Sequence, residues 1–373
     1  MQYTTLGKTG LKVSRLGFGA MRLPMEGEEN KQQIDRSKAI PMIHTAFEAG
    51  VTYIDTAVGY CNGDSQRVVG EALKGWRDKI VVSTKNHYFG DKEAEWWQNL
   101  EDSLERLNID CIDIYNTHGV NATKLEESVR PHVLGWLNKA KDQGLIKHIC
   151  TSFHDDANAL MKIVDSGIYA SLTVQYNMLD RSMEDGIAHA HESGMGVVVM
   201  GPVAGGRLGS QNQVFETLIP GINRIPELAM RFVLSNPNVD IALSGMSTMA
   251  QVEENIRACS DDIALKADEQ LIIDDQLERL KRAADLYCTG CKYCMPCPSG
   301  VDIPRVFDIY NEGRVYGLQN NARKTYEKWA AKQENSKVAT ACVECGKCEE
   351  LCPQHIPIMT QLKEAHDYLT QGC

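Results

Sequence analysis

Residues 79–118 read KIVVSTKNHYFGDKEAEWWQNLEDSLERLNIDCIDIYNTH, and this stretch decides the fold. It begins with a short β-branched run and continues through an amphipathic segment at residues 92–108 that ends on Asn. A second β-rich run follows at residues 111–118. Two such runs joined by a helix are typical of a βαβ unit, in which both strands are parallel. The stretch therefore predicts a parallel sheet covered by helices.

The same alternation extends in both directions, as far as about Cys259. Candidate strands lie at residues 14–20, 52–57, 79–85, 111–118, 146–153, 171–177, 196–202 and 240–246. Amphipathic segments lie between them, for example at residues 37–50, 65–75 and 225–236. Eight strands alternating with helices predict an α/β fold, a closed (β/α)8 or TIM barrel. Ahead of the first strand, MQYTTLGKTGLKV predicts a hairpin that closes the N-terminal mouth of the barrel.

The length predicts two domains. The chain has 373 residues, and barrels of this kind need about 250. A hydrophobic content of 43% with 24% charged residues is typical of a globular protein. The charged, periodic segment at residues 264–286 predicts one helix that leads out of the barrel. We therefore predict a barrel at residues 1–285 and a smaller, mainly helical domain at residues 286–373.

Charge and hydropathy limit the partners. The formal net charge is −11, and no basic stripe offsets it, so we expect no nucleic acid and no anionic membrane surface as partner. No stretch approaches the roughly 18 apolar residues of a membrane helix. The first twenty residues lack the order of charge, apolar run and cleavage site found in signal peptides. We expect a cytoplasmic protein.

Eight of the thirteen cysteines lie in two short runs near the C-terminus. The first run is Cys288, Cys291, Cys294 and Cys297, and the second is Cys342, Cys345, Cys348 and Cys352. Disulfides are rare in proteins that are not exported, and zinc needs only four ligands, usually in two separated C-x2-C pairs. Three thiolates spaced by two residues can hold three irons of one cubane. The pattern favours iron-sulfur clusters over zinc.

The second run resembles the C-x2-C-x2-C-x3-C-P pattern of bacterial-type ferredoxins, while the first has only two residues before its last cysteine. In such ferredoxins the fourth cysteine of each run binds the other cluster. The resemblance implies a ferredoxin-like domain with two 4Fe-4S clusters. One would be held by Cys288, Cys291, Cys294 and Cys352, and the other by Cys342, Cys345, Cys348 and Cys297. The remaining five cysteines are interpreted as ordinary core or surface thiols.

Four polar residues lie where barrel enzymes place their reactive groups, at or just after the C-terminal ends of strands. They are Asp55, Tyr60, Lys85 and His118. Taken singly, each has an ordinary structural explanation, such as a turn cap, a core edge, a solvated cation or a packed histidine.

Together they resemble the catalytic tetrad of the aldo-keto reductases. The stretches VSRLGFGAMRLP, GVTYIDTAVGY, VVSTK, IYNTHG and QVEENI resemble signatures of that family, in its order, over about residues 1–260. The resemblance implies an NAD(P)H-dependent oxidoreductase in which Tyr60 protonates the forming alkoxide. An adjacent ammonium, Lys85, would draw the pKa of the phenol down from about 10, and Asp55 would keep that ammonium charged. His118 would bind and orient the substrate carbonyl.

The resemblance also implies contacts to the dinucleotide. They are Ser152 and Gln175 at the carboxamide, Met200 against the nicotinamide, and Ser244, Glu254 and Asn255 towards the adenine side. The residue after Ser152 is Phe153, where the family usually has an amide, and Met200 stands where it usually has an aromatic ring. No Lys or Arg lies at residues 244–255 to pair with a 2′-phosphate, although Ser244, Ser247 and Thr248 could donate to one, so NAD and NADP both stay open.

Three readings of the whole chain remain. The first is an NAD(P)H-dependent oxidoreductase that interconverts a small carbonyl compound and an alcohol. The second is an electron-transfer protein whose clusters exchange electrons with a partner protein or a flavin, since clusters carry single electrons and nicotinamides carry hydrides. The third is a sensor that uses an enzyme fold, and the complete tetrad counts against it.

Overall fold

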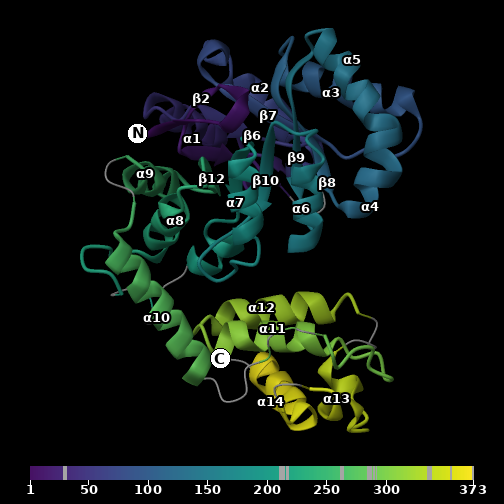
Figure 1. The fold of residues 1–373 in the computed structure, drawn as a ribbon. Coiled ribbons are helices and arrows are strands. Elements are labelled where there is room, and N and C mark those ends of the chain that lie inside the picture. The colour runs from purple at the N-terminus through teal and green to yellow at the C-terminus, as the bar shows by residue number, and fades with distance from the viewer. Residues whose placement is uncertain are drawn as a thin grey trace. The chain divides into compact units, whose positions relative to one another are not determined.

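Eight parallel strands close into a barrel in the order β10-β11-β12-β3-β6-β7-β8-β9 (Figure 1). Their bounds are β3 Leu16–Gly19, β6 Tyr53–Asp55, β7 Val81–Asn86, β8 Ile112–Val120, β9 Ile146–Phe153, β10 Ser171–Gln175, β11 Gly196–Met200 and β12 Ile241–Gly245. Their side chains are almost all buried, because one face fills the barrel and the other packs under helices. The predicted (β/α)8 barrel and its eight strands are confirmed.

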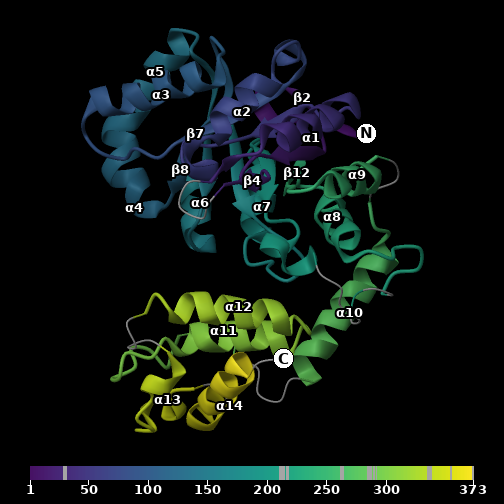
Figure 2. The ribbon, with the colours of Figure 1, turned by 180° about the vertical axis from the view of Figure 1, so that it is seen from behind.

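Helices lie around the outside of the strands (Figures 1 and 2). They are α1 Arg36–Glu48, α2 Ser65–Ala72, α3 Glu93–Leu107, α4 Ala122–Lys124, the π-helical η4 Leu125–Val133, α5 Leu134–Asp142, α6 Ala157–Asp165, α7 Glu184–Glu192, α8 Ile225–Ser235 and α9 Met249–Ala258. Asn108 ends α3 in the left-handed conformation, with φ of 51°. A short polar residue tolerates that conformation, so the predicted stop signal is confirmed.

A hairpin closes the N-terminal end of the barrel. Strands β1 Tyr3–Thr5 and β2 Lys12–Ser14 pair antiparallel around the turn η1 Gly7–Thr9. Leu6 is fully buried, and it packs so closely on Gly196 that a Cβ there would lie 2.6 Å from its side chain. Because Gly196 is the first residue of β11, this contact places the hairpin at the barrel's N-terminal end, as predicted.

The structure, a computed structural model, describes residues 1–27, 32–209, 215, 218–260, 264–283, 288, 290, 292–333, 338–352 and 355–371. The chain divides into two compact units, residues 1–209 with 226–265, and residues 210–225 with 266–373. The boundary predicted at residues 285 and 286 falls outside the described residues and stays a prediction. Among the helices that are described, none has the length and apolar character needed to cross a membrane.

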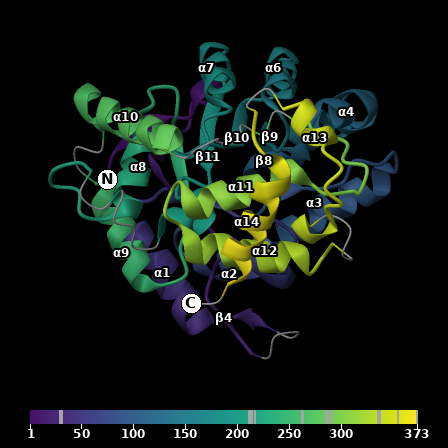
Figure 3. The same cartoon turned by 90° about the horizontal axis from the view of Figure 1, so that it is seen from below.

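The second unit is mainly helical, as predicted. It contains α10 Ala267–Ala283, α11 Ile303–Arg314, α12 Gln319–Ala330, η6 Ala339–Ala341, α13 Lys347–Glu350 and α14 Ile358–Thr370. Helices α11, α12 and α14 lie side by side (Figure 3) and enclose a small apolar core that includes Phe307, Tyr326 and Leu362. Asp302 caps α11 by accepting a hydrogen bond from the Arg305 amide at 3.3 Å. This small core is the support on which the two cysteine runs are built.

Candidate functional site

Strand register brings the predicted tetrad together at the C-terminal end of the barrel. Asp55 is the last residue of β6, Lys85 lies near the end of β7, and His118 lies near the end of β8. These three strands are consecutive in the barrel, so their C-terminal ends are neighbours. Tyr60 begins the turn that follows β6. The fold therefore brings all four residues to the C-terminal mouth of the barrel.

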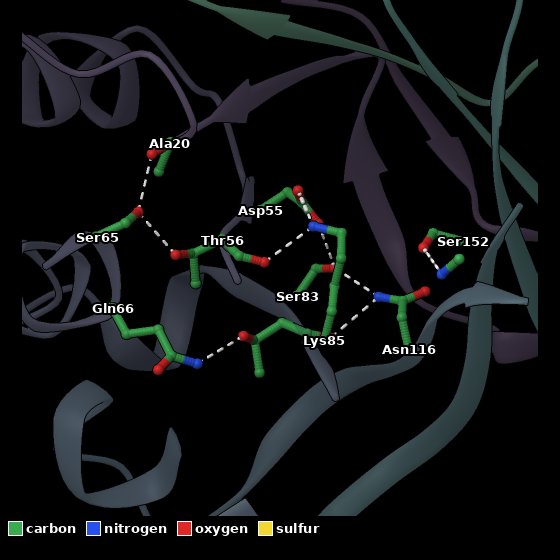
Figure 4. Close-up of polar contacts among 11 residues, drawn as sticks. Ala20, Asp55, Thr56, Ser65, Gln66, Ser83, Lys85, Asn116 and Ser152 are labelled. Atoms are coloured by element: carbon green, nitrogen blue, oxygen red, sulfur yellow. Dashed lines mark hydrogen bonds and ion pairs between the residues drawn. The ribbon is translucent and has the colours of Figure 1, made fainter. Parts of the chain in front are cut away.

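A buried ion pair forms the centre of the site (Figure 4). The Lys85 Nζ donates to Asp55 Oδ2 at 2.5 Å and to the Thr56 carbonyl at 2.9 Å. Both charged side chains are only 2–3% exposed. A buried ammonium is tolerated only when it is paired and hydrogen-bonded, and both conditions are met here. Burial lowers the pKa of Lys85, but the charge and hydrogen bonds of Asp55 and Tyr60 together raise it by more, so the pKa is raised and the lysine stays charged, as predicted.

The Lys85 ammonium lies 4.7 Å from the centre of the Tyr60 ring. Burial raises the pKa of Tyr60, Lys85 lowers it and Asp55 raises it, and the net direction is upward. Lys85 lowers the pKa of Tyr60, as predicted. The predicted fall of the pKa is wrong in this structure, because loss of solvation around the phenol outweighs the nearby charge. Tyr60 is therefore a protonated phenol at neutral pH.

The turn after Tyr60 is strained at Cys61. Cys61 and Asn62 have φ of 51° and 58°, in the left-handed region, which asparagine tolerates but cysteine rarely adopts. The turn is held by Asn62 Nδ2, which donates to the Gln32 carbonyl at 3.0 Å, and by the Cys61 thiol, which lies 3.4 Å from the Met21 carbonyl oxygen. Such strain costs about 1–3 kcal/mol per residue and persists only where surrounding contacts enforce it.

His118 lies beside Tyr60 on an irregular strand end. Its ring meets the Tyr60 ring edge-on, with centroids 6.3 Å apart. The register of β8 against β9 shifts between Thr117 and Val120, and Gly119, with φ of 72°, absorbs the bend. Burial, followed by the neighbouring groups Lys85, His154, His87 and Lys124, lowers the pKa of His118 to about 4. The imidazole is therefore neutral at physiological pH.

The predicted dinucleotide residues lie along the next strand ends of the same mouth. Ser152 is buried near the end of β9, and its Oγ accepts a hydrogen bond from the Gly119 amide at 2.9 Å. Gln175 and Met200 are the last residues of β10 and β11 and are register partners. Both are half-buried.

The predicted residues on the adenine side lie on β12 and α9. Asn255 Nδ2 donates to Ser244 Oγ at 2.9 Å, so these two side chains are brought together. Glu254 is half-buried and precedes Asn255 on α9. A serine, amide side chains and a thioether are groups that can bind a nicotinamide dinucleotide, and their placement at one mouth is compatible with one.

Two polar residues behind the ion pair were not identified from the sequence. Ser83 Oγ donates to Asp55 Oδ1 at 2.8 Å, and Asn116 Nδ2 donates to Ser83 Oγ at 3.1 Å. Both are register partners of the tetrad, Ser83 opposite Asp55 and Asn116 opposite Lys85. Their signal was the alternation of β7 and β8, which points every second side chain into the barrel.

Arg22 was also missed, and it lies near the dinucleotide residues. Its carbonyl accepts a hydrogen bond from Ser247 Oγ at 2.7 Å. Its side chain passes Gly245, where an added Cβ would lie 3.5 Å from the arginine stem, and its guanidinium reaches Gly205 and Gly206. Arg22 is distant in sequence from residues 244–255. The absence of Lys and Arg from that segment therefore gave no sign that a cation lies nearby.

The cysteines of both runs converge on the core of the second unit. Six of the predicted ligands pack against it: Cys288, Cys294, Cys297, Cys342, Cys348 and Cys352. Cys345 is exposed, and Cys291 lies outside the described residues. Among the residues that are described, no three Cys, His, Asp or Glu side chains meet closely enough to hold a single metal ion.

One electrostatic interaction crosses between the two cysteine runs. The pKa of Cys348 is raised by burial, then by Glu349, and then by two thiols, Cys342 of its own run and Cys297 of the other. The Cys297 thiol is therefore near enough to act electrostatically on Cys348. In addition, the Glu344 amide donates to the Cys342 sulfur at 3.4 Å, the kind of bond that supports cluster thiolates. The residues present fit an iron-sulfur cluster shared between the runs.

Comparisons with known proteins agree with this geometry. The profile of the aldo/keto reductase family matches residues 15–278, and that of a 4Fe-4S dicluster domain matches residues 287–356. An NADH-specific methylglyoxal reductase of Escherichia coli is 28% identical over 337 residues, covering 76% of this chain and 100% of the relative.

Solved structures give the same result. An aldo-keto reductase from Bacillus halodurans, in its holo form, has a TM-score of 0.64 and 28% identity, covering 74% of this chain and 96% of that one. An aldo/keto reductase from Klebsiella pneumoniae, solved with NADP and acetate, has a TM-score of 0.62 and 25% identity, covering 74% and 95%. With most of its length matched by one family profile, the chain is an oxidoreductase that belongs to the aldo/keto reductase family and carries a C-terminal 4Fe-4S domain.

Proposed function

We propose that the protein interconverts a small aldehyde or ketone and the corresponding alcohol with NAD(P)H. The observation that carries the proposal is the buried Lys85–Asp55 pair beneath Tyr60, with the neutral His118 ring against the phenol. This arrangement supplies a proton donor and a neutral hydrogen-bond donor at one point. Both are what reduction of a carbonyl group requires.

The chain's own residues account for the proton. Tyr60 is protonated because burial raises its pKa, so it can give a proton to an oxygen that gains negative charge. The phenolate that remains is stabilised by the Lys85 ammonium, and Asp55 and Thr56 hold that ammonium in place. A neutral His118 can donate its own N–H to the same oxygen without repelling Lys85.

The nicotinamide, when bound, supplies or accepts the hydride. We assign its carboxamide to Ser152 and Gln175 and one ring face to Met200, because these residues end three consecutive strands beside His118. Ser244, Glu254 and Asn255 would face the adenine side. Arg22 adds a cation near the start of α9, which is a feature that a dinucleotide phosphate can use.

The test is NAD(P)H oxidation by the full chain, purified without oxygen, with a panel of aldehydes and ketones. Tyr60→Phe is expected to lower kcat by about 10²–10⁴, the usual contribution of a general acid. Tyr3→Phe is the matched control, since it removes a phenol hydroxyl at the hairpin. If wild type and Tyr60→Phe reduce every carbonyl at the same rate, the proposal fails.

For the second unit we propose two 4Fe-4S clusters. One is held by Cys342, Cys345, Cys348 and Cys297, and the other by Cys288, Cys291, Cys294 and Cys352. The proximity of Cys297 to Cys348 supports the exchange of the fourth ligand between the runs. Iron and sulfide analysis of the anaerobic protein tests the count, and about eight of each per chain are expected.

A second function, transfer of single electrons to a partner protein, is favoured by the surface around the second run. Cys345 is exposed, and the neighbouring Val343 is 69% exposed although it is a large apolar residue. Tyr293 of the first run is 67% exposed. Coupling the clusters to a nicotinamide needs a converter from two electrons to one, such as a flavin. Cofactor extraction decides: a chain without flavin whose clusters NAD(P)H does not reduce excludes this route.

A further inference from the structure

We propose that the carbonyl substrate is an anion, a short aldehyde or ketone whose carboxylate is held by Lys124 and His154 beside the reacting group. This inference rests on the proposed function, because it names the substrate class for the same site. Neither residue belongs to the tetrad.

Three consecutive strands of the barrel each end in a histidine. His87 follows β7, His118 lies near the end of β8, and His154 follows β9. Adjacent strands lie about 5 Å apart, so these imidazoles are neighbours along the rim. His154 lies beside Gly119, the residue that follows His118, because a Cβ added to Gly119 would lie 4.0 Å from His154 Cδ2. Such a row offers ring N–H donors at the mouth.

Lys124 completes the row and is fixed in place. Asn121 caps the short helix α4 by accepting a hydrogen bond from the Lys124 amide at 2.7 Å. The Lys124 Nζ donates to the Gly119 carbonyl at 2.8 Å and lies 4.4 Å from the centre of the Phe89 ring. Within the described residues, no carboxylate pairs with this ammonium. Its remaining N–H donors are available to a ligand.

Two lysines act on this row of histidines. After burial, which is the largest cause, Lys85, His154, His87 and Lys124 lower the pKa of His118, and Lys85 and Lys124 lower the pKa of His154. Lys85 is already neutralised by Asp55, so Lys124 supplies the uncompensated charge. Such an ammonium in a chain of net charge −11 is a local feature that runs against the overall charge. A carboxylate would pair with the Lys124 ammonium and accept a hydrogen bond from the His154 ring.

The site also limits the length of the substrate. The carbonyl oxygen must reach Tyr60 and His118, while the carboxylate must reach His154 and Lys124. Since His118 and His154 lie on adjacent strands about 5 Å apart, about zero to two carbons between the carbonyl carbon and the carboxylate carbon span the distance. Glyoxylate, pyruvate and 4-oxobutanoate cover this range.

The experiment compares each of these acids with its methyl ester as substrate for the anaerobic full chain. We expect at least one acid to have kcat/KM about tenfold or more above its ester, which is the worth of one charge-assisted hydrogen bond. Lys124→Met should reduce that ratio about tenfold. Lys12→Met is the matched control, because the Lys12 ammonium also lies over an aromatic ring, 5.6 Å from the centre of Tyr3, in the hairpin.

A binding measurement separates this proposal from the proposed function. Calorimetry with the Tyr60→Phe protein should show about tenfold weaker binding of the preferred acid when Lys124→Met is added. If no carbonyl is reduced but this difference appears, the anion site stands and the proposed function falls. Equal kcat/KM for acids and esters, a ratio that Lys124→Met leaves unchanged, or equal binding in the calorimeter overturns the anion proposal.

Discussion

The barrel site and the cysteine region are ordered in different ways. In the barrel, Asp55 and Lys85 are buried, paired and hydrogen-bonded by neighbouring residues, so protein contacts alone complete the site. In the second unit the described cysteines of the two runs are half-buried or exposed around a small core. A site fixed by strand register needs no ligand to form. A site whose ligands lie in irregular loops depends on the metal to draw them together.

The largest expected effect is loss of order in the second unit when iron is removed. Metal binding free energy is folding free energy in small domains, because their cores are too small to hold the fold. Anaerobic chelation should accelerate amide exchange in α11 and α14 by about a hundredfold or more, while exchange in β7 changes less than about twofold. Hydrogen-deuterium exchange with mass spectrometry measures both in one sample.

Cys348→Ser should reproduce this effect in part, since it removes one proposed ligand. Cys111→Ser is its control, because Cys111 is a half-buried cysteine of the barrel with no proposed ligand role. If α11 stays equally protected without iron, the small core around Phe307 suffices and the contrast between the two regions is lost.

A smaller effect is expected from breaking the ion pair in the barrel. Lys85→Met leaves the Asp55 carboxylate buried without its cation, which costs about 3–5 kcal/mol of unfolding free energy. Adding Asp55→Leu removes the stranded charge and should restore a large part of that stability, although activity stays absent. Urea unfolding of the barrel, followed by tryptophan fluorescence, measures the difference. A double variant as unstable as the single one would show that packing, rather than charge, causes the loss.

The sequence predicted the parts of this comparison that depend on local pattern. Alternating strands and helices predicted the barrel, and the position of Asp55, Lys85 and His118 at strand ends, together with the resemblance to the aldo-keto reductases, predicted the tetrad. Ser83 and Asn116 were missed because their roles depend on which residues face each other across strands, and register is a tertiary property. The rise in the pKa of Tyr60 was not predicted for a related reason, because the burial that causes it is set by the packed structure.

The strain at Cys61 had no sequence signal either. Left-handed residues are usually glycine or asparagine, so Asn62 suits the turn, whereas Cys61 adopts that conformation because of contacts with segments far away in the chain. In the second unit, spacing predicted iron-sulfur ligands, and the resemblance to ferredoxins implied that Cys297 joins Cys348 at one cluster. The electrostatic effect of Cys297 on Cys348 depends on how the two runs pack on one core, which spacing does not describe.

The pH dependence of the unfolding free energy should change when His118 is replaced. Its pKa in the folded protein is about 4, against an ordinary value of 6.5, so the folded state favours the neutral ring. As pH falls from about 6.5 towards 4, the unfolded state binds the proton first, and the unfolding free energy decreases. We expect His118→Gln to remove roughly 1–2 kcal/mol of that decrease, allowing for partial exposure.

Unfolding midpoints at a series of pH values between 7 and 4.5 measure this difference. His154→Gln serves as a second variant, because the pKa of His154 is also lowered, by burial first and then by Lys85 and Lys124. Its effect should be the smaller of the two, since His154 is more exposed to solvent. An identical pH dependence in wild type and His118→Gln would contradict a neutral, buried imidazole at the site.

The smallest expected effect is at the strained turn, and it tests whether the barrel site is held under strain for function. Cys61→Gly removes the Cβ that makes a φ of 51° unfavourable, and it adds entropy to the unfolded chain, so the net gain in stability should be at most about 1 kcal/mol. Cys61→Ala is the matched control, because it removes the thiol contact but keeps the Cβ. If the strained turn positions Tyr60, the glycine variant should be slightly more stable but about two- to fivefold slower in kcat. The reason is that a relaxed turn no longer holds the phenol as close to the reacting oxygen as the strained wild-type turn does. A glycine variant as fast as wild type would mean that Lys85 and His118 alone fix the phenol, and that the strain at Cys61 serves the loop rather than the chemistry.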